Sequence, residues 1–198
     1  MQTLGLAAES KRSDGWLKSI FWPTVENAWD VDYLGQQGMW VCTFAAASSL
    51  IFSIPTGHPV VIFFGVLSAL FYLLGGMGVR QGSLMSASMV FAVYVLGLLI
   101  QAAAIEGRSI LRILLAAVLL SNLRATYLAS HWRPAAEGED RPTRFRETLA
   151  DKYVDQMPAK FWPILQIPFL ILGICMLLFT LAAFGLFFVQ RAGLLSHR

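Results

Sequence analysis

Five stretches of this chain are apolar enough to cross a lipid bilayer, and none of the 12 Asp and Glu residues lies inside them. Crossing about 30 Å of hydrocarbon takes roughly 20 consecutive apolar residues. Such stretches occur at 34–54, 60–79, 84–105, 110–129 and 164–189. We therefore expect an all-α integral membrane protein with a bundle of about five transmembrane helices. Acidic side chains inside spans are the usual working groups of proton relays and ion-coupled carriers, so their absence argues against those mechanisms.

The composition supports one membrane domain. The chain is 57% hydrophobic and 14% charged, whereas soluble domains carry about 25% charged residues. We divide it into a cytoplasmic interfacial segment at 1–33, a four-helix membrane region at 34–129, a cytoplasmic connection at 130–163, a last transmembrane helix at 164–190 and a tail at 191–198. The net charge of +3 would suggest nucleic acid as a partner of a soluble protein. Here the basic residues flank spans, so we expect no nucleic acid.

Lys and Arg residues outside the spans are concentrated on one side of the membrane if there are five spans. One side has three, Arg108, Arg191 and Arg198. The other side has ten: Lys11, Arg12, Lys18, Arg80, Arg133, Arg141, Arg144, Arg146, Lys152 and Lys160. The positive-inside rule places the richer side in the cytoplasm. We therefore expect a cytoplasmic N-terminus and an external C-terminus.

The fourth span differs from the other four in containing two arginines. Arg112 and Arg124 lie near opposite ends of the stretch 110–129, so each side chain can extend to its nearer membrane surface. If this stretch lay flat on the membrane, the C-terminus would be cytoplasmic instead.

Two segments are typical of amphipathic interfacial helices on the cytoplasmic side. The N-terminal segment 1–33 interleaves aromatic residues with Lys and acidic residues, which suits a helix in the headgroup layer. In the connection, four apolar residues recur at intervals of four and form one helical stripe: Phe145, Leu149, Tyr153 and Met157. Pro163 is expected to open the last helix.

Three acids on the connecting helix share the same spacing, Glu147, Asp151 and Asp155. Their oxygens are suitable ligands for a divalent cation, but Arg144 and Lys152 stand beside them, which favours a solvated helix face. None of the three histidines lies in the middle of a span, so a buried bis-histidine haem is disfavoured. We expect no metal and no cofactor.

A polar run at the end of the fourth span is the best candidate for a binding site. Asn122 and Arg124 are expected to be desolvated, because placing both in lipid is costly. Arg124 presents a planar fork of donors that suits a lipid phosphate or an acid on the same side of the membrane, namely Glu26, Asp30 or Asp32. Three readings stay open: extension of Arg124 to ordinary headgroups, an internal ion pair, and an anionic-lipid or substrate site that includes His131.

The Asn-Leu-Arg-Ala-Thr-Tyr run at 122–127, at the end of a span and after short hydrophobic hairpins, resembles uncharacterised small multi-pass bacterial inner-membrane proteins. The resemblance covers the middle of the chain. It implies the inner membrane as the location and implies no activity. The five-span tryptophan-rich sensory proteins share the span number and Trp content, but their paired aromatic and proline motifs are missing here.

Small residues are expected to bring the helices together, because hydrophobicity does not favour helix association inside lipid. The run 75–78 contains three glycines, which predict close backbone approach, a frayed helix end or a hinge. Cys42 and Cys175 are expected to be unpaired and buried, because they differ in depth. A stripe on the first span has the same small character: Ala45, Ser49 and Ser53.

Three classes of function fit the sequence. The first is a non-catalytic accessory, scaffold or lipid- or partner-binding membrane protein, which agrees with the lack of catalytic motifs. The second is a small channel or uncoupled carrier lined by Ser, Asn, Gln and Tyr. The third is an interfacial enzyme acting on a lipid headgroup through Arg124, His131 and the acids near Glu26. The expected partners are the bilayer, anionic lipid, and a membrane protein or a second copy of the chain.

Overall fold

The computed structural model describes residues 23–25, 28–104, 110–131 and 152–196, and every structural statement below refers to these residues. The predicted N-terminal interfacial segment up to residue 22, Glu26 and most of the connection at 132–151 lie outside them. The described residues form helices joined by short turns, without a strand. The all-α prediction is confirmed for this part of the chain.

Five helices are long and apolar enough to cross a membrane, as predicted. The fourth, which contains both arginines, is one of them. Their bounds are Ala28–Ser53 for α2, Pro59–Arg80 for α3, Leu84–Ala104 for α4, Ile110–Ser130 for α5 and Met157–Ser196 for α7. The helix α2 begins six residues before the predicted span, because polar residues around Asp30 continue the helix beyond its apolar part.

Tight turns join α2 to α3 and α3 to α4. The 3-10 turn Ile54–Thr56 is followed by Gly57 with φ 65°, whose N–H donates to the Ile54 carbonyl at 3.3 Å. Gly82 has φ 70° between α3 and α4. Positive φ is favourable only for glycine among common residues, so these two positions set where the chain reverses. The helices α2 and α3 therefore form an antiparallel hairpin.

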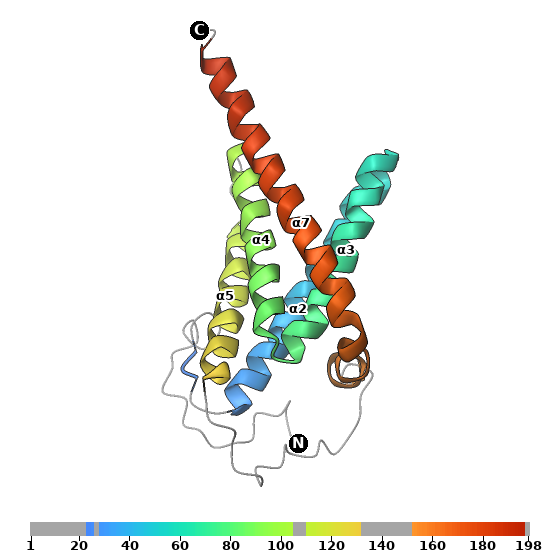
Figure 1. Ribbon diagram of the computed structural model, residues 1–198, viewed down its shortest axis with the longest axis vertical. Coiled ribbons are helices and arrows are strands. Elements are labelled where there is room, and N and C mark those ends of the chain that lie inside the picture. The colour runs from blue at the N-terminus through green and yellow to red at the C-terminus, as the bar shows by residue number, and fades with distance from the viewer. Residues whose placement is uncertain (1–22, 26–27, 105–109, 132–151, 197–198) are drawn as a thin grey trace.

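The first four helices form a ring in which each contacts the next, and α5 contacts α2 to complete it. The last helix, α7, lies outside this ring across α3 and α4. Figure 1 shows that α2 and α3 lean away from α4, α5 and α7 toward one end of the molecule. We call this the splayed end. The opposite end, where α2, α4 and α7 begin and α3 and α5 end, is the closed end.

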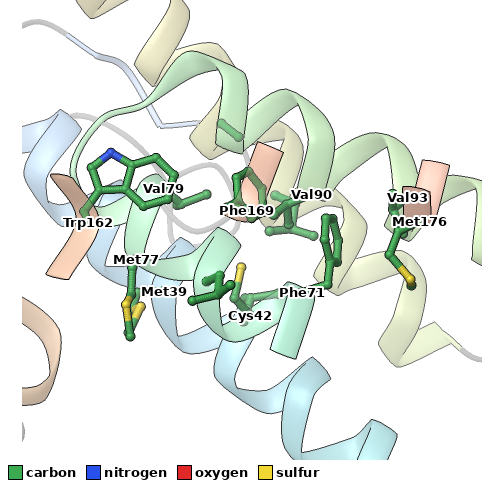
Figure 2. Close-up of a cluster of buried hydrophobic side chains, with 14 residues drawn as sticks. Met39, Cys42, Phe71, Met77, Val79, Val90, Val93, Trp162, Phe169 and Met176 are labelled. Carbon is green, nitrogen blue, oxygen red and sulfur yellow. The ribbon is translucent and has the colours of Figure 1, made fainter. Parts of the chain in front are cut away.

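The buried core lies toward the closed end, around α3 (Figure 2). Phe71 of α3 stacks on Phe169 of α7 with ring centroids 5.5 Å apart, and Trp162 packs against Phe169 at 5.7 Å. Met39 and Cys42 of α2 enter the same cluster. The last helix is thus attached to the ring mainly by aromatic side chains that meet α3.

Three glycines near the end of α3 allow this close packing. A methyl group on Gly76 would lie 2.8 Å from Cys42 Cβ, and one on Gly75 would overlap Val90. One on Gly78 would overlap Ser86 and Trp162. All three glycines are buried in a continuous helix. Close backbone approach is therefore the correct reading of the run 75–78.

The splayed end exposes apolar side chains instead of burying them. On α3, Val60, Phe63 and Val66 are exposed, whereas Phe71 is fully buried. Cys175 of α7 is also exposed, which corrects the expectation that both cysteines are buried; Cys42 is buried as expected. Exposed apolar helix faces of this kind are suited to lipid, which solvates them as well as another helix does.

The last helix begins before Pro163, which corrects the predicted start. A π turn, η2 (Lys152–Gln156), leads directly into α7. Pro158 follows directly on the π turn, and without an N–H it cannot donate to a carbonyl of that turn. Pro163 and Pro168 lie inside the helix. At 40 residues, α7 is about 60 Å long at 1.5 Å per residue, so it exceeds the hydrocarbon thickness of a bilayer.

Candidate functional site

The candidate site is a polar cluster at the closed end that links three elements. It consists of Asp32 and Thr43 from α2, Arg80 from α3, and Tyr153 and Asp155 from the π turn. We call these five residues the polar cluster. They come from parts of the chain far apart in sequence, so their meeting depends on the tertiary fold.

Arg80 is the centre of the polar cluster. Its Nη1 donates to Asp32 Oδ1 at 2.7 Å and to the Asp32 carbonyl at 3.3 Å. Its Nη2 and Nε both donate to Asp155 Oδ1, at 2.5 and 3.1 Å. The Arg80 side chain is 9% exposed, while those of Asp32 and Asp155 are 37% and 31% exposed. A nearly buried guanidinium is thus neutralised by two carboxylates that water can reach.

The α2–α3 hairpin explains why Asp32 meets Arg80. The two residues are equidistant along the chain from Thr56 in the turn, so an antiparallel pair of helices places them at the same level. An acid near the start of one helix and an arginine at the end of the next also complement both helix dipoles. Gly35 lies beside the guanidinium: a methyl group there would be in ordinary contact with Arg80 Nη1, at 3.6 Å.

A second link joins the π turn to α2. Thr43 Oγ1 donates to the Met39 carbonyl at 2.9 Å and lies 2.8 Å from the Tyr153 hydroxyl. A hydroxyl has one hydrogen, so Tyr153 is the donor to Thr43. The Tyr153 ring also packs against Trp40 with centroids 5.8 Å apart. Tyr153 was predicted to face the membrane in an apolar stripe; instead it contacts the bundle.

Asp155 also differs from its predicted role. It was placed with Glu147 and Asp151 on a solvated helix face, but its carboxylate binds Arg80. The π turn lies against α3, and this tertiary contact brings Asp155 to Arg80. Glu147 and Asp151 lie outside the described residues. Among the described residues, no three His, Cys, Asp or Glu side chains form a group that could hold a metal ion.

The described residues of the predicted site around Arg124 make the following contacts. Asn122 is 2% exposed, as expected for a desolvated residue, and it packs beside Gly38 of α2. Arg124 Nη1 donates to the Pro23 carbonyl at 3.0 Å. Asp30 is partly buried in the first turn of α2, and Glu26 lies outside the described residues. Asp32, one of the three proposed partners of Arg124, belongs to Arg80 instead.

His131, the remaining predicted site residue, is exposed at the end of α5. Its Nδ1 lies 2.9 Å from the Tyr127 carbonyl and 3.2 Å from Ser130 Oγ, and its ring packs on that of Tyr127. These are contacts within one helix end. They do not bring His131 to the Arg80 carboxylate pair.

Sequence reasoning used Arg80 only for membrane orientation and so missed the centre of the cluster. The signal that could have found it is the hairpin register, which pairs Asp32 with Arg80 across the turn. Asp155 carries no comparable signal, because its approach depends on a π turn after a long connection. No protein family, curated protein or solved structure matches this chain.

Proposed function

We propose that the chain is a non-catalytic polytopic membrane protein of the bacterial inner membrane, which acts as an accessory or scaffold by binding lipid or a membrane partner. The observation that carries this proposal is that polar side chains at the closed end bind other segments of the same chain. Arg80, Tyr153 and Arg124 all donate hydrogen bonds that connect different segments of the chain. Groups held in this way support a rigid framework.

The exposed surface supports the same proposal. Along α7, large aliphatic residues face outward from one end of the span to the other: Ile164, Ile167, Ile171, Ile174, Leu178 and Leu181. Such a surface is solvated by lipid tails or covered by another membrane protein. Binding through apolar faces needs no reactive group.

The channel alternative has less support in the described residues. Of the polar residues available to line a path on α4, Ser88 and Gln101 are exposed. Ser86 packs against Gly78, and the Tyr94 hydroxyl lies 3.4 Å from the Arg112 carbonyl. These positions do not converge on one another. The enzyme alternative requires Arg124 and His131 at one reaction centre, and each is engaged in separate contacts.

We further propose that the closed end faces the cytoplasm. The basic residues Arg80, Arg124, Lys152 and Lys160 all belong to this end of the described chain. Positive charge next to spans favours the cytoplasmic side. This orientation places the N-terminus in the cytoplasm and the end of α7 outside.

The proposal is tested by extracting the tagged protein with its surrounding bilayer into polymer nanodiscs and identifying the retained proteins and lipids by mass spectrometry. We expect a membrane protein in fixed stoichiometry, or an anionic lipid enriched above its share of the membrane. An unrelated five-span protein extracted in the same way is the control for bulk lipid.

A nanodisc fraction with bulk lipid composition and no stoichiometric protein would contradict a binding role. Solute flux through proteoliposomes of the purified protein would then support the channel. Release of a modified lipid headgroup on incubation with inner-membrane lipid would support the enzyme.

A further inference from the structure

The outward face of α7 carries a regular stripe of large aliphatic side chains. Its six members alternate at spacings of three and four residues, and they are between 44% and 73% exposed. No Asp, Glu, Lys or Arg occurs from 161 to 190. We call this stripe the α7 seam, and its members are Ile164, Ile167, Ile171, Ile174, Leu178 and Leu181.

The spacing of the seam is that of a left-handed coiled coil. Alternating spacings of three and four repeat every seven residues, and a straight α-helix drifts by about 20° in each such repeat. The repeat stays in line when two helices supercoil, and each side chain of the seam then enters a hole on the facing helix. Lipid tails require apolar side chains but no such repeat. The pattern therefore favours another helix as the neighbour of the seam.

Two small residues beside the seam support the same reading. Cys175 and Ala182 follow Pro168 at seven-residue intervals, and all three are exposed. In membranes, small side chains on a helix surface allow a second helix to approach closely. The opposite side of α7 is already occupied, because Phe169 and Met176 are buried in the core around α3. The seam is thus the side of α7 that remains for a neighbour.

The last helix also extends past α3 at the splayed end. Phe179 of α7 stacks on Phe64 of the antiparallel α3, with ring centroids 4.6 Å apart. Pro59, where α3 begins, lies five residues before Phe64, so positions more than five residues past Phe179 lie beyond α3. Leu186 and Val189 are in that part and are 63% and 69% exposed; Figure 1 shows the projecting end. Lipid tails that match the length of α3 do not reach them, whereas a second helix of equal length does.

We propose that two copies of the chain associate through the α7 seam, as a parallel pair of α7 helices related by a two-fold axis along the membrane normal. All copies of a membrane protein are inserted in the same orientation, so two α7 helices meet in parallel and equal residues lie at the same depth. This inference names a second copy as the partner of the apolar surface, and it rests on the proposed binding role.

The surface of the seam has the size that a stable dimer needs. At their observed exposures the six seam residues present roughly 700 Å² per copy, against about 800 Å² per partner in a standard interface. The seam contains no charge, so a copy of itself leaves no ion without a partner. An identical uncharged stripe on each copy is self-complementary, as a two-fold interface requires.

The pairing is tested by disulfide cross-linking in native membranes, with single cysteines in a Cys175→Ser background, since Cys42 is buried. The seam positions are Ile171→Cys and Ile174→Cys. The control is Val66→Cys on α3, a residue that is 50% exposed and lies near the Phe64–Phe179 contact, at a similar depth. We expect a covalent dimer as the main product at both seam positions and a minor product at Val66, where chains meet only by collision.

Subunit counting by single-molecule photobleaching in bilayers measures the strength of the pairing. Ile171→Ala combined with Leu178→Ala removes packing atoms from the seam and should raise the dissociation constant of the dimer about tenfold or more. The matched double variant, Val66→Ala with Leu70→Ala, removes exposed aliphatic side chains from α3 and should leave the constant unchanged. All four side chains are exposed within one copy, so both double variants should unfold at the wild-type temperature when monomeric.

Equal cross-linking yields at Ile174 and Val66 would overturn the pairing and assign the seam to lipid, as would equal dissociation constants for the two double variants. A cross-link from the seam cysteines to a different protein would also overturn it, while supporting the binding role. Failure of the binding role itself is seen separately, as nanodiscs that hold one copy in bulk lipid and no other protein. The cysteine experiment gives its reading even if the alanine variants do not fold.

Discussion

Arg80 donates to Asp155, a residue 75 positions later in the chain, through both Nη2 and Nε. The same guanidinium holds Asp32, 48 positions earlier. One side chain therefore joins the start of the first span, the end of the second and the approach to the last. Among the described helix contacts, which are mainly apolar, this ion pair ties the three segments together at the closed end.

Removing Arg80 should destabilise the protein measurably. Arg80→Gln deletes the hydrogen bonds to two carboxylates, and we expect a loss of about 2 kcal/mol, since the partly exposed acids regain water. Arg80→Lys should cost less but not restore stability, because an ammonium lacks the planar fork that reaches both acids. Thermal unfolding of the purified protein in detergent measures both. Arg112→Gln, which removes an arginine of α5, is the matched control, and an equal loss there would show that any span arginine matters as much.

Asp32 should be energetically coupled to Arg80 and not to Arg124. Asp32→Asn combined with Arg80→Gln should show an interaction energy of about 0.5–3 kcal/mol, because the two changes remove one shared bond. Asp32→Asn combined with Arg124→Ala should be additive within about 0.5 kcal/mol. Unfolding of the four single and double variants measures both cycles. Coupling to Arg124 of the same size would restore the predicted ion pair between α5 and Asp32.

The positions of the five helices follow from hydrophobicity, so the sequence predicts them well. The ends of α2 and α7 were less predictable, because helices continue past their apolar parts wherever polar residues find partners, as around Asp30 and Asp155. The hairpin turn at Gly57 was predictable from its local chemistry. The glycines at 75–78 predicted that another helix would pack closely against them, but they did not indicate which helix.

The candidate site was predictable only in part. Burial of Asn122 followed from its place on a span, whereas the bond from Arg124 to the Pro23 carbonyl is not one of the predicted contacts with an acidic side chain. The polar cluster was missed because Asp155 and Tyr153 reach it only where the π turn Lys152–Gln156 packs against the bundle. A helical stripe groups residues on one face but does not show which element that face contacts, so it assigned Tyr153 and Asp155 to the wrong surroundings.

The glycines of α3 and those of the outer faces should respond oppositely to alanine. A methyl group on Gly78 overlaps Ser86 and Trp162, whereas one on Gly97 meets no atom within 4 Å. We expect Gly78→Ala to lower stability by about 1–3 kcal/mol through overpacking. Gly97→Ala should be neutral or stabilising by up to about 1 kcal/mol, since alanine favours the helix. Unfolding in detergent measures both, and an equal loss at the two positions would mean that α4 is also closely packed at Gly97.

Membrane orientation can be tested with single cysteines in a Cys175→Ser background. If the closed end is cytoplasmic, a cysteine at Gly138 should be shielded from an impermeant thiol reagent in intact cells, and one at Ser196 should be labelled. The reason is the excess of Lys and Arg on the side of the connection 130–163. Permeabilising the cells should make both positions reactive, which controls for the accessibility of each thiol. Labelling of both cysteines in intact cells, or of neither, would place them on the same side of the membrane. In that case Ile110–Ser130, with its two arginines, would not cross the bilayer.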